Sequence, residues 1–554
     1  MDIAAGQAFF ILLCAGVLSV PVALLIQWRY GRVIRREMTA ASKAEMDAPA
    51  SAHAARQGST LPVLSIEEIN AGSELACPAY TNARRSLHHA VMIYAAAGLA
   101  YALPFAIAWS YQADGALLAW RRITLLAGIQ YWPAAIAISL IAASILVERS
   151  KIFTGLFAGL AAFSIYELAI SPDLTVTQLL KLWLVTNGPA TLLIILFLFR
   201  RVRPVAPFVL SFLLVIITGA LVVSQVILLP RQGLVWAVEV GTKLGLSGTG
   251  IFYGLHLLCL LLCVIPGWFL MRYFGSLYRR KRASEQSIML DSLFGIFAFE
   301  QTLVLSAHGQ TRYLIVGPVS FGAYKLVKWI GFGAVQRESG NAPVLLLLRV
   351  FALSSRSERL FDSLTPGWRR AGSVVMIAGP DLVRSSIQPH ELLEFVGGKI
   401  SRRFVADPAQ LAEQITSLDL NPDPDGRYRI NQFFCHRDSW QSTMRELAKH
   451  SSVVLMDLRS FSARNQGCIY EFGQLLDAFD LRRVLFVIDE TTDRQFLTNT
   501  LSKLWRQVTA ESPNASAPRP TVRLFKARLN SSRDLRRLLQ LLLAPATTTT
   551  AATA

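Results

Sequence analysis

Long apolar segments fill the first half of the chain. A helix needs about 20 apolar residues to cross the hydrocarbon core of a bilayer. Seven segments meet this requirement and predict transmembrane helices at residues 8–27, 87–109, 125–147, 152–170, 179–199, 205–229 and 250–271. Residues 1–283 are therefore expected to form a helical membrane domain.

Two further apolar segments, residues 288–306 and 313–334, contain charged residues. These are Asp291, Glu300, Lys325 and Lys328. Because a charged side chain is costly inside a bilayer, the pair forms either two more spans or a re-entrant or interfacial hairpin. Both alternatives return the chain to the same side, so residues 284–340 are expected to form an apolar hairpin.

Composition supports a membrane protein. The 554 residues are 53% hydrophobic and have a mean hydropathy of +0.41, far above the usage of soluble proteins. The net charge of +18 raises the question of nucleic acid binding. However, arginine clusters directly follow apolar segments, at residues 29–36, 200–203 and 272–282. The positive-inside rule explains this distribution better, so we expect the lipid bilayer as a partner and no nucleic acid.

The same rule predicts the orientation of the chain. If the basic clusters lie on the cytosolic side, the N-terminus is outside and everything after Met271 begins in the cytosol. Residues 37–86 then form a cytosolic loop, whose Ala/Ser-rich part lacks periodicity and is expected to be flexible. The six cysteines show neither a disulfide framework nor zinc spacing, and no metal site is expected.

The second half of the chain alternates short apolar runs with amphipathic segments. The runs predict strands at residues 344–350, 374–378, 427–434, 453–456, 484–488 and 522–525, with helices between them. This pattern predicts an α/β domain with a doubly wound parallel sheet at residues 341–545. The expected fold is thus an α-helical polytopic membrane bundle followed by a cytosolic α/β domain, with a disordered tail at residues 546–554.

One strand–loop–helix segment, residues 453–477, is the strongest candidate for a chemical site. Asp457 and Arg459 follow the strand, and Ser462, Asn465 and Gln466 lie in the loop and at the start of the helix. Glu471 falls beside the apolar stripe of that helix. Ligands of open α/β sheets bind outside the carboxyl ends of the strands, so these residues are assigned to ligand binding.

The segment Asn-Gln-Gly-Cys-Ile-Tyr-Glu-Phe, residues 465–472, resembles the part of TIR domains in which Cys precedes a Glu by a few positions. Gly467 stands where that family usually has Trp, and a long insertion precedes the strand. In NAD-cleaving TIR domains the Glu is catalytic, so the resemblance implies this role for Glu471 and NAD as the substrate. No bound cofactor is required.

The whole chain also resembles uncharacterised bacterial polytopic membrane proteins that end in a TIR-like, flavodoxin-like α/β domain. This resemblance implies the bacterial inner membrane as the location and self-association through the cytosolic domain. It implies no known activity.

Chemistry at Glu471 has two interpretations. A carboxylate beside the ribose can stabilise an oxocarbenium-like transition state, as in glycosidases, and Arg349, Arg356 and Arg459 can bind a pyrophosphate. Alternatively, Glu471 only favours an early helical turn electrostatically. A P-loop is excluded, because residues 397–399 lack the upstream glycine and the Ser/Thr after the lysine.

Three functions therefore stay open. The first is a membrane-anchored TIR-like domain that binds a nucleotide and cleaves NAD in signalling or a stress response. The second is a non-enzymatic interaction module. The third is a transporter with a regulatory tail, for which Glu167 and His256 within the spans are the candidate residues.

Overall fold

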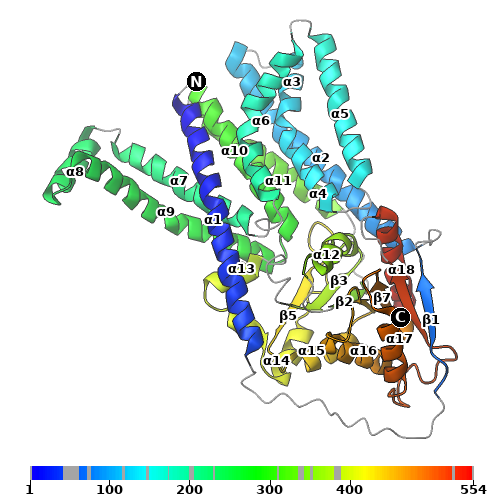
Figure 1. Cartoon of the computed structure of the whole chain (residues 1–554). Helices are drawn as coiled ribbons and strands as arrows, with labels where there is room; N and C mark the ends of the chain where they lie inside the picture. The colour runs from blue at the N-terminus through cyan, green and yellow to red at the C-terminus, as the bar shows by residue number, and fades with distance from the viewer. Residues whose placement is uncertain are drawn as a thin grey trace.

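The computed structural model describes residues 3–40, 61–70, 77–114, 119–144, 149–171, 174–198, 205–228, 231–308, 311–334, 342–349, 354–379, 389–526 and 531–551. Helices of the first part gather at one end of the molecule, and the sheet with its helices lies at the other (Figure 1). The helical part comprises α1 (Ile3–Thr39), α2 (Pro78–Asp114), α3 (Trp120–Gln130), α4 (Trp132–Ser144), α5 (Arg149–Ile170), α6 (Val176–Leu198), α7 (Ala206–Leu228), α8 (Arg231–Lys243), α9 (Gly248–Arg279), α10 (Glu285–His308), η1 (Thr311–Ile315) and α11 (Val316–Ala334).

Six helical segments are long and apolar enough to cross a membrane. Five of them coincide with expected spans, and the sixth is α10, from the weaker apolar pair. The other two expected spans also form helices, α6 and α7, whose side chains are described only in part. The span expected at residues 125–147 is interrupted between α3 and α4 at Tyr131, where Pro133 follows and cannot donate a backbone hydrogen bond.

The α/β part holds the remaining elements. They are β2 (Val344–Arg349), α12 (Ser354–Trp368), β3 (Ser373–Ile377), α13 (Pro389–Val396), η2 (Ile400–Arg403), β4 (Phe404–Val405), α14 (Pro408–Thr416), β5 (Ile430–Cys435), α15 (Trp440–Lys449), β6 (Val453–Asp457), α16 (Gln466–Ala478), η3 (Leu481–Arg483), β7 (Val484–Ile488), α17 (Arg494–Trp505), β8 (Thr521–Lys526) and α18 (Ser532–Ala551). The six expected strands are confirmed. Asp407 caps α14, accepting from the Gln410 N–H at 2.7 Å, and Pro408 follows at the first helical position.

The sheet has eight strands in the order β1-β8-β7-β6-β2-β3-β5-β4, and every pairing is parallel. With the two-residue β4 left out and the other strands numbered within the domain, β5-β3-β2-β6-β7-β8 is the order 3-2-1-4-5-6. The flavodoxin-like order implied by the resemblance is 2-1-3-4-5. The two strand orders differ because β5, which comes from the long insertion before β6, pairs with β3 on the side away from β2.

Helices cover both faces of the sheet, as the continuous apolar strands require. Along β2, Leu346 and Leu348 face a core shared with α14–α17, whereas Leu345 and Leu347 face a core shared with α12 and α18. Cys77, directly before α2, lies in the second core, and Ala79 and Tyr80 of the first turn of α2 pack against it. The edge of the domain formed by α13, β4 and β5 joins the core of the helical part.

The prediction that residues 37–86 form only a loop is wrong. Residues 41–60 and 71–76 lie outside the described residues, but Ser65–Ile69 forms strand β1, paired in register with β8. In Figure 1, β1 is the blue arrow at the edge of the sheet. This strand is held by backbone pairing with β8, and almost all of its side chains are exposed. Hydrophobic periodicity in the sequence therefore did not predict it.

The expected tail also differs, since α18 continues to Ala551. A helix that is already nucleated extends at little cost, and this extension includes four threonines despite their low helix propensity.

α1 and α2 have 37 residues each, which corresponds to about 55 Å against a hydrocarbon thickness of about 30 Å. The excess length carries one end of each helix to the α/β domain. At that end of α1, the Tyr30 ring packs edge-on against Phe395 at 5.2 Å, and the backbone carbonyl of Glu37 lies 3.0 Å from the ring of His436.

Phe472 tests the predicted core of the domain. It is fully buried and packs edge-on against Phe486 at 4.7 Å, so Phe472→Ala should lower the free energy of unfolding by about 3–5 kcal/mol. The thermal unfolding midpoint of the purified protein measures this loss. The matched substitution Gln495→Ala, at an exposed position of α17, should leave the midpoint unchanged; equal effects of the two variants would contradict the core assignment.

Candidate functional site

The predicted site lies where the strand order reverses. β2 is central, and the chain leaves it toward β3 on one side and returns through β6 on the other. Ligands of doubly wound sheets bind at such a switch point, outside the carboxyl ends of the strands. β6 ends at Asp457 and is followed by the loop to α16, which brings the predicted residues to this edge.

Asp457 and Arg459 form a buried ion pair at the carboxyl end of β6. The Arg459 guanidinium donates to both carboxylate oxygens, at 2.8 and 2.7 Å, and the two residues are 2% and 6% exposed. A buried pair of this kind holds both side chains in one orientation, and removing one partner leaves an uncompensated charge. Asp457 therefore serves first to orient Arg459.

The loop after β6 carries an unusual backbone conformation. Ser460 has φ +59°, a left-handed conformation that costs a non-glycine residue roughly 1–2 kcal/mol. Its hydroxyl lies 2.8 Å from that of Thr491, which donates to Asp489 at the end of β7. The loop conformation thus links the carboxyl ends of two neighbouring strands.

Three predicted residues stabilise the start of α16. The side-chain oxygen of Asn465 accepts from the backbone N–H and the hydroxyl of Ser462, at 2.9 and 3.1 Å. Gln466 donates to the Ala463 carbonyl at 3.0 Å. These contacts fix the loop between β6 and α16.

Glu471 lies on the buried face of α16. It is 0% exposed and shares this face with Cys468, Phe472 and Leu475. The sequence placed it beside the apolar stripe, whereas the structure places it within the covered face. Arg349 ends β2 and Arg356 lies in α12, but the side chains of both are outside the described residues.

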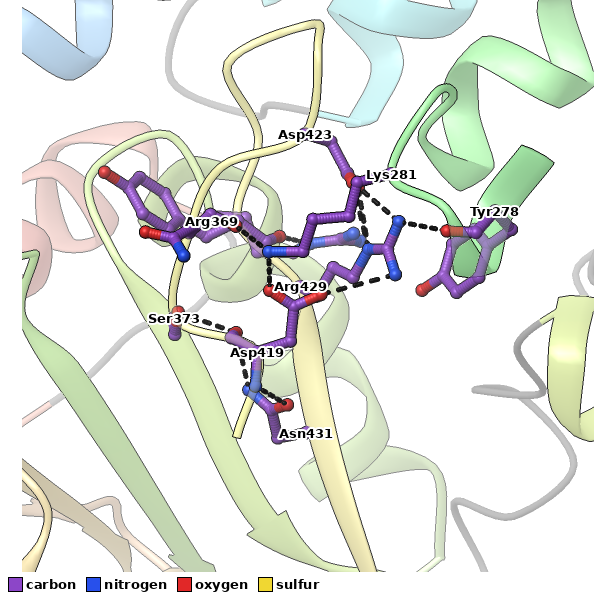
Figure 2. A network of polar contacts seen from close by, with 10 residues as sticks. Tyr278, Lys281, Arg369, Ser373, Asp419, Asp423, Arg429 and Asn431 are labelled. Carbon is purple, nitrogen blue, oxygen red and sulfur yellow. Dashed lines mark hydrogen bonds and ion pairs between the residues drawn. The ribbon is translucent and has the colours of Figure 1, made fainter. Parts of the chain in front are cut away.

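A second polar site joins the helical part to the α/β domain. We call it the junction: Tyr278, Lys281 and residues 284–286 on one side, and Arg369, Arg370 and residues 419–429 on the other. Arg429 is at its centre (Figure 2). Its guanidinium donates to the Asp423 carboxylate at 2.7–3.1 Å and to the Tyr278 carbonyl at 2.6 Å. It also stacks over the Tyr278 ring at 3.9 Å.

Further contacts surround Arg429. Lys281, at φ +54° in the turn between α9 and α10, forms an ion pair with Asp419. The Ser284 hydroxyl donates to Asp425. The remaining contacts are Arg427 to Gln286 at 2.9 Å, Arg369 to Glu285 at 3.5 Å and Arg370 to the Asp425 carbonyl at 2.8 Å. Two ion pairs, Lys281 with Asp419 and Arg369 with Glu285, thus cross the junction beside hydrogen bonds from neutral groups.

Burial changes the electrostatics of the junction. Burial raises the pKa of Asp423 to about 6, although the hydrogen bonds from Arg429 act in the opposite direction. Burial lowers the pKa of Arg427 to about 9, and the neighbouring Arg369 adds to this effect. Both shifts show that charge is costly here and that the pairing only partly offsets the cost.

A cavity of about 340 Å³ opens beside the junction. Its lining is mainly polar and comes from α9, α13, η2, α14, the following loop and β5. The residues are Tyr278, Glu391, Arg402, Arg403, Gln414, Ser417, Leu418, Asp419, Arg429, Ile430, Asn431, Gln432 and Phe433.

Three of the four charged residues expected in the apolar hairpin form one cluster inside the helical part. Asp291 of α10 accepts from Lys325 at 2.7 Å and from Tyr324 at 2.8 Å, and it forms an ion pair with Lys328. Mutual neutralisation explains how these charges are accommodated between apolar helices.

The two candidate residues within spans differ in environment. Glu167 is 0% exposed, whereas His256 is half-buried and its ring bonds the Phe252 carbonyl at 2.8 Å. Among the described residues, no three His, Cys, Asp or Glu side chains gather as metal ligands.

In comparisons with known proteins, no protein-family model, no curated protein and no solved structure matches this chain. The TIR resemblance, the orientation in the membrane and self-association therefore stay predictions.

Asp423 tests the electrostatics of the junction. Its pKa is raised above that of an unfolded Asp, near 3.9, to about 6. Its contribution to stability is thus fully present below about pH 4 and is lost as the pH rises through 6, by up to about 3 kcal/mol at 1.36 kcal/mol per pKa unit. Thermal midpoints between pH 4 and 8 should show this slope for the native protein.

The variant Asp423→Asn supplies the comparison, since it cannot ionise. The difference between the native and variant midpoints should change with pH only between about 4 and 6. A constant difference across the whole range would contradict the burial cost assigned to this carboxyl.

Proposed function

We propose that this chain is a membrane-anchored signalling protein in which a nucleotide-binding α/β domain is coupled to a helical membrane bundle. The bundle spans the membrane through the long apolar helices, with the α/β domain in the cytosol of a bacterium. Changes in the bundle and ligand binding in the domain influence each other through the junction.

The junction is the observation that carries this proposal. An inert anchor needs only a linker, whereas here ion pairs and hydrogen bonds connect the α9–α10 turn to the loop before β5. Buried charged contacts have strict geometric requirements, because each displaced partner leaves a charge without compensation. A movement of α9 must therefore displace residues 419–429, or be resisted by them.

The switch point supports nucleotide binding. The strand order is that of folds that bind dinucleotides where the order reverses, and the loop after β6 is held in a left-handed conformation at Ser460. Such strained positions cluster at ligand sites. Arg459, already oriented by Asp457, is the candidate for the phosphate groups.

NAD is the proposed ligand and Glu471 the proposed catalytic carboxylate. The support is the resemblance of residues 465–472 to TIR domains. Glu471 follows the N-terminus of α16 by less than two turns, close to the carboxyl edge of the sheet. Its burial means that the carboxylate acts only if the bound ribose reaches the covered face of the helix.

The ion pair between Lys281 and Asp419 tests the coupling. Lys281→Asp and Asp419→Lys each bring like charges together across the junction, so each should lower the thermal midpoint and increase hydrogen exchange in residues 419–435. The double exchange restores opposite charges between these two positions but leaves the new lysine beside Arg429, which lies 3.3 Å from Asp419 in the native protein. It should therefore recover part of the loss. Each kcal/mol corresponds to about 2–4 °C for a protein of 150–250 residues.

An exposed ion pair within α15, Lys449 with Glu446, is the control, and its exchange should have almost no effect. If the double exchange at the junction is no better than the sum of the single substitutions, the two sides are not coupled through this contact.

NAD binding and cleavage test the ligand. The full chain in lipid nanodiscs should bind NAD and release nicotinamide, and Glu471→Gln should reduce the rate by about 100-fold or more, as loss of a catalytic acid or base does. The control Glu490→Gln changes an exposed residue of the same domain. Binding without release would remove the catalytic role of Glu471, and absence of both would favour a non-enzymatic interaction module.

A further inference from the structure

We infer that the cavity beside the junction and the arginines around it form a binding site for a phosphate-bearing anion, of the kind carried by acidic phospholipid headgroups. This inference rests on the membrane placement in the proposed function. It adds a lipid partner at the junction itself.

Six arginines lie on or next to elements that line the cavity or contact its lining. We call them the basic collar: Arg32, Arg35 and Arg36 of α1, Arg279 at the end of α9, Arg280 directly after it, and Arg402 of η2, which itself lines the cavity. All six side chains are exposed, and no ion pair joins any of them to an acidic residue of the described chain. Positive charge without local compensation attracts anions.

The collar residues come from distant parts of the sequence, and α13 and η2 hold them together. Tyr30 of α1 packs against Phe395 of α13, and the Ser401 hydroxyl donates to Glu37 at 3.1 Å. On the other side, Gly275 of α9 touches Leu393 so closely that any Cβ would overlap it. The ends of α1 and α9 therefore lie on either side of the same short segment.

The cavity gives the collar a place to bind a headgroup. Its volume of about 340 Å³ is within the range of small-ligand pockets, roughly 300–1,000 Å³. Its two lining carboxylates are already paired, because Glu391 lies 3.4 Å from Arg403 and Asp419 lies 3.3 Å from Arg429. Arg402 has no such partner in the described chain and remains to bind an incoming anion.

Aromatic residues mark the level of the collar relative to a bilayer. Trp28 on α1 and Trp268 and Tyr273 on α9 are exposed, and Trp and Tyr are enriched at membrane–water interfaces. Arg32 follows Trp28 by one turn and stacks over its ring at 3.8 Å. The arginines of both helices thus lie where headgroup phosphates are found, and basic pockets at this level bind acidic lipids.

The positive-inside rule explains arginines at helix ends, but it does not account for Arg402 and Arg403. These two belong to the α/β domain and line the same cavity as Tyr278 of α9. Convergence of the domain and the helix end on one polar cavity is the feature that points to a ligand.

Lipid retention tests the inference. The full chain in nanodiscs containing phosphatidylcholine and phosphatidylglycerol is released into the gas phase, and native mass spectrometry counts the phosphatidylglycerol that stays bound. Arg402→Gln should weaken retention about five-fold, which corresponds to about 1 kcal/mol for one basic residue at a membrane surface. Arg402→Lys keeps the charge and should retain the lipid.

The control is Arg464→Gln, which removes an equally exposed arginine from the loop before α16. A second arm adds inorganic phosphate to nanodiscs of phosphatidylcholine alone and follows the thermal midpoint. If phosphate raises the midpoint of the native protein, Arg402→Gln abolishes this increase and the native protein retains no phosphatidylglycerol, the anion site would belong to a soluble ligand. Equal retention and equal midpoints in Arg402→Gln and Arg464→Gln would overturn the site.

The lipid test is independent of nucleotide chemistry. Failure of NAD binding with intact phosphatidylglycerol retention would leave the anion site in place. Loss of the anion site with intact NAD binding would leave the proposed function in place.

Discussion

The connection between the two parts of the molecule depends on Arg429, which Asp423 of the same loop holds in place against Tyr278 of α9. The guanidinium is shared between the Asp423 carboxylate, the Tyr278 carbonyl and the Tyr278 ring, and Asp423 is 0% exposed. Because neither charge reaches bulk water easily, each needs the other in place. A buried pair of this kind contributes little net stability but strongly penalises any arrangement that separates its partners.

The remaining architecture brings the α/β domain, with this pair, against the end of α9. The extra length of α1 and α2 reaches the domain. The insertion between β3 and β6 supplies α13, η2, β4, α14 and β5, and these elements contact the helical part. The segment that departs from a simple doubly wound sheet is thus the segment that connects it to the bundle. The switch point at β2 and β6 lies in the interior of the sheet.

Local patterns predicted much of this structure. Buried parallel strands are continuous apolar runs, so β2, β3, β6, β7 and β8 could be located from the sequence. The start of α14 was evident from Asp407 and Pro408. The β6–loop–α16 segment could be found because polar residues directly follow an apolar strand.

Contacts between distant residues could not be predicted in this way. Strand β1 is polar and pairs with β8 across more than 450 residues, so neither periodicity nor spacing reveals it. The junction joins residues near 280 to residues near 425, and its only local signal is the density of Asp and Arg around the turn at residues 421–426. The burial of Glu471 depends on a rotation of α16 by part of a turn, which hydrophobic spacing does not fix.

The contacts at the junction should make the helical part and the α/β domain move as one unit. The most direct test is an electron–electron distance measurement between spin labels at Arg272 on α9 and Arg464 before α16, both exposed, in the full chain in nanodiscs. We expect a single narrow distance distribution, which Asp423→Ala broadens because Arg429, without its partner, is no longer held against Tyr278. A broad distribution in the native protein would show that the domain moves freely on the bundle and that the junction does not hold the two parts together.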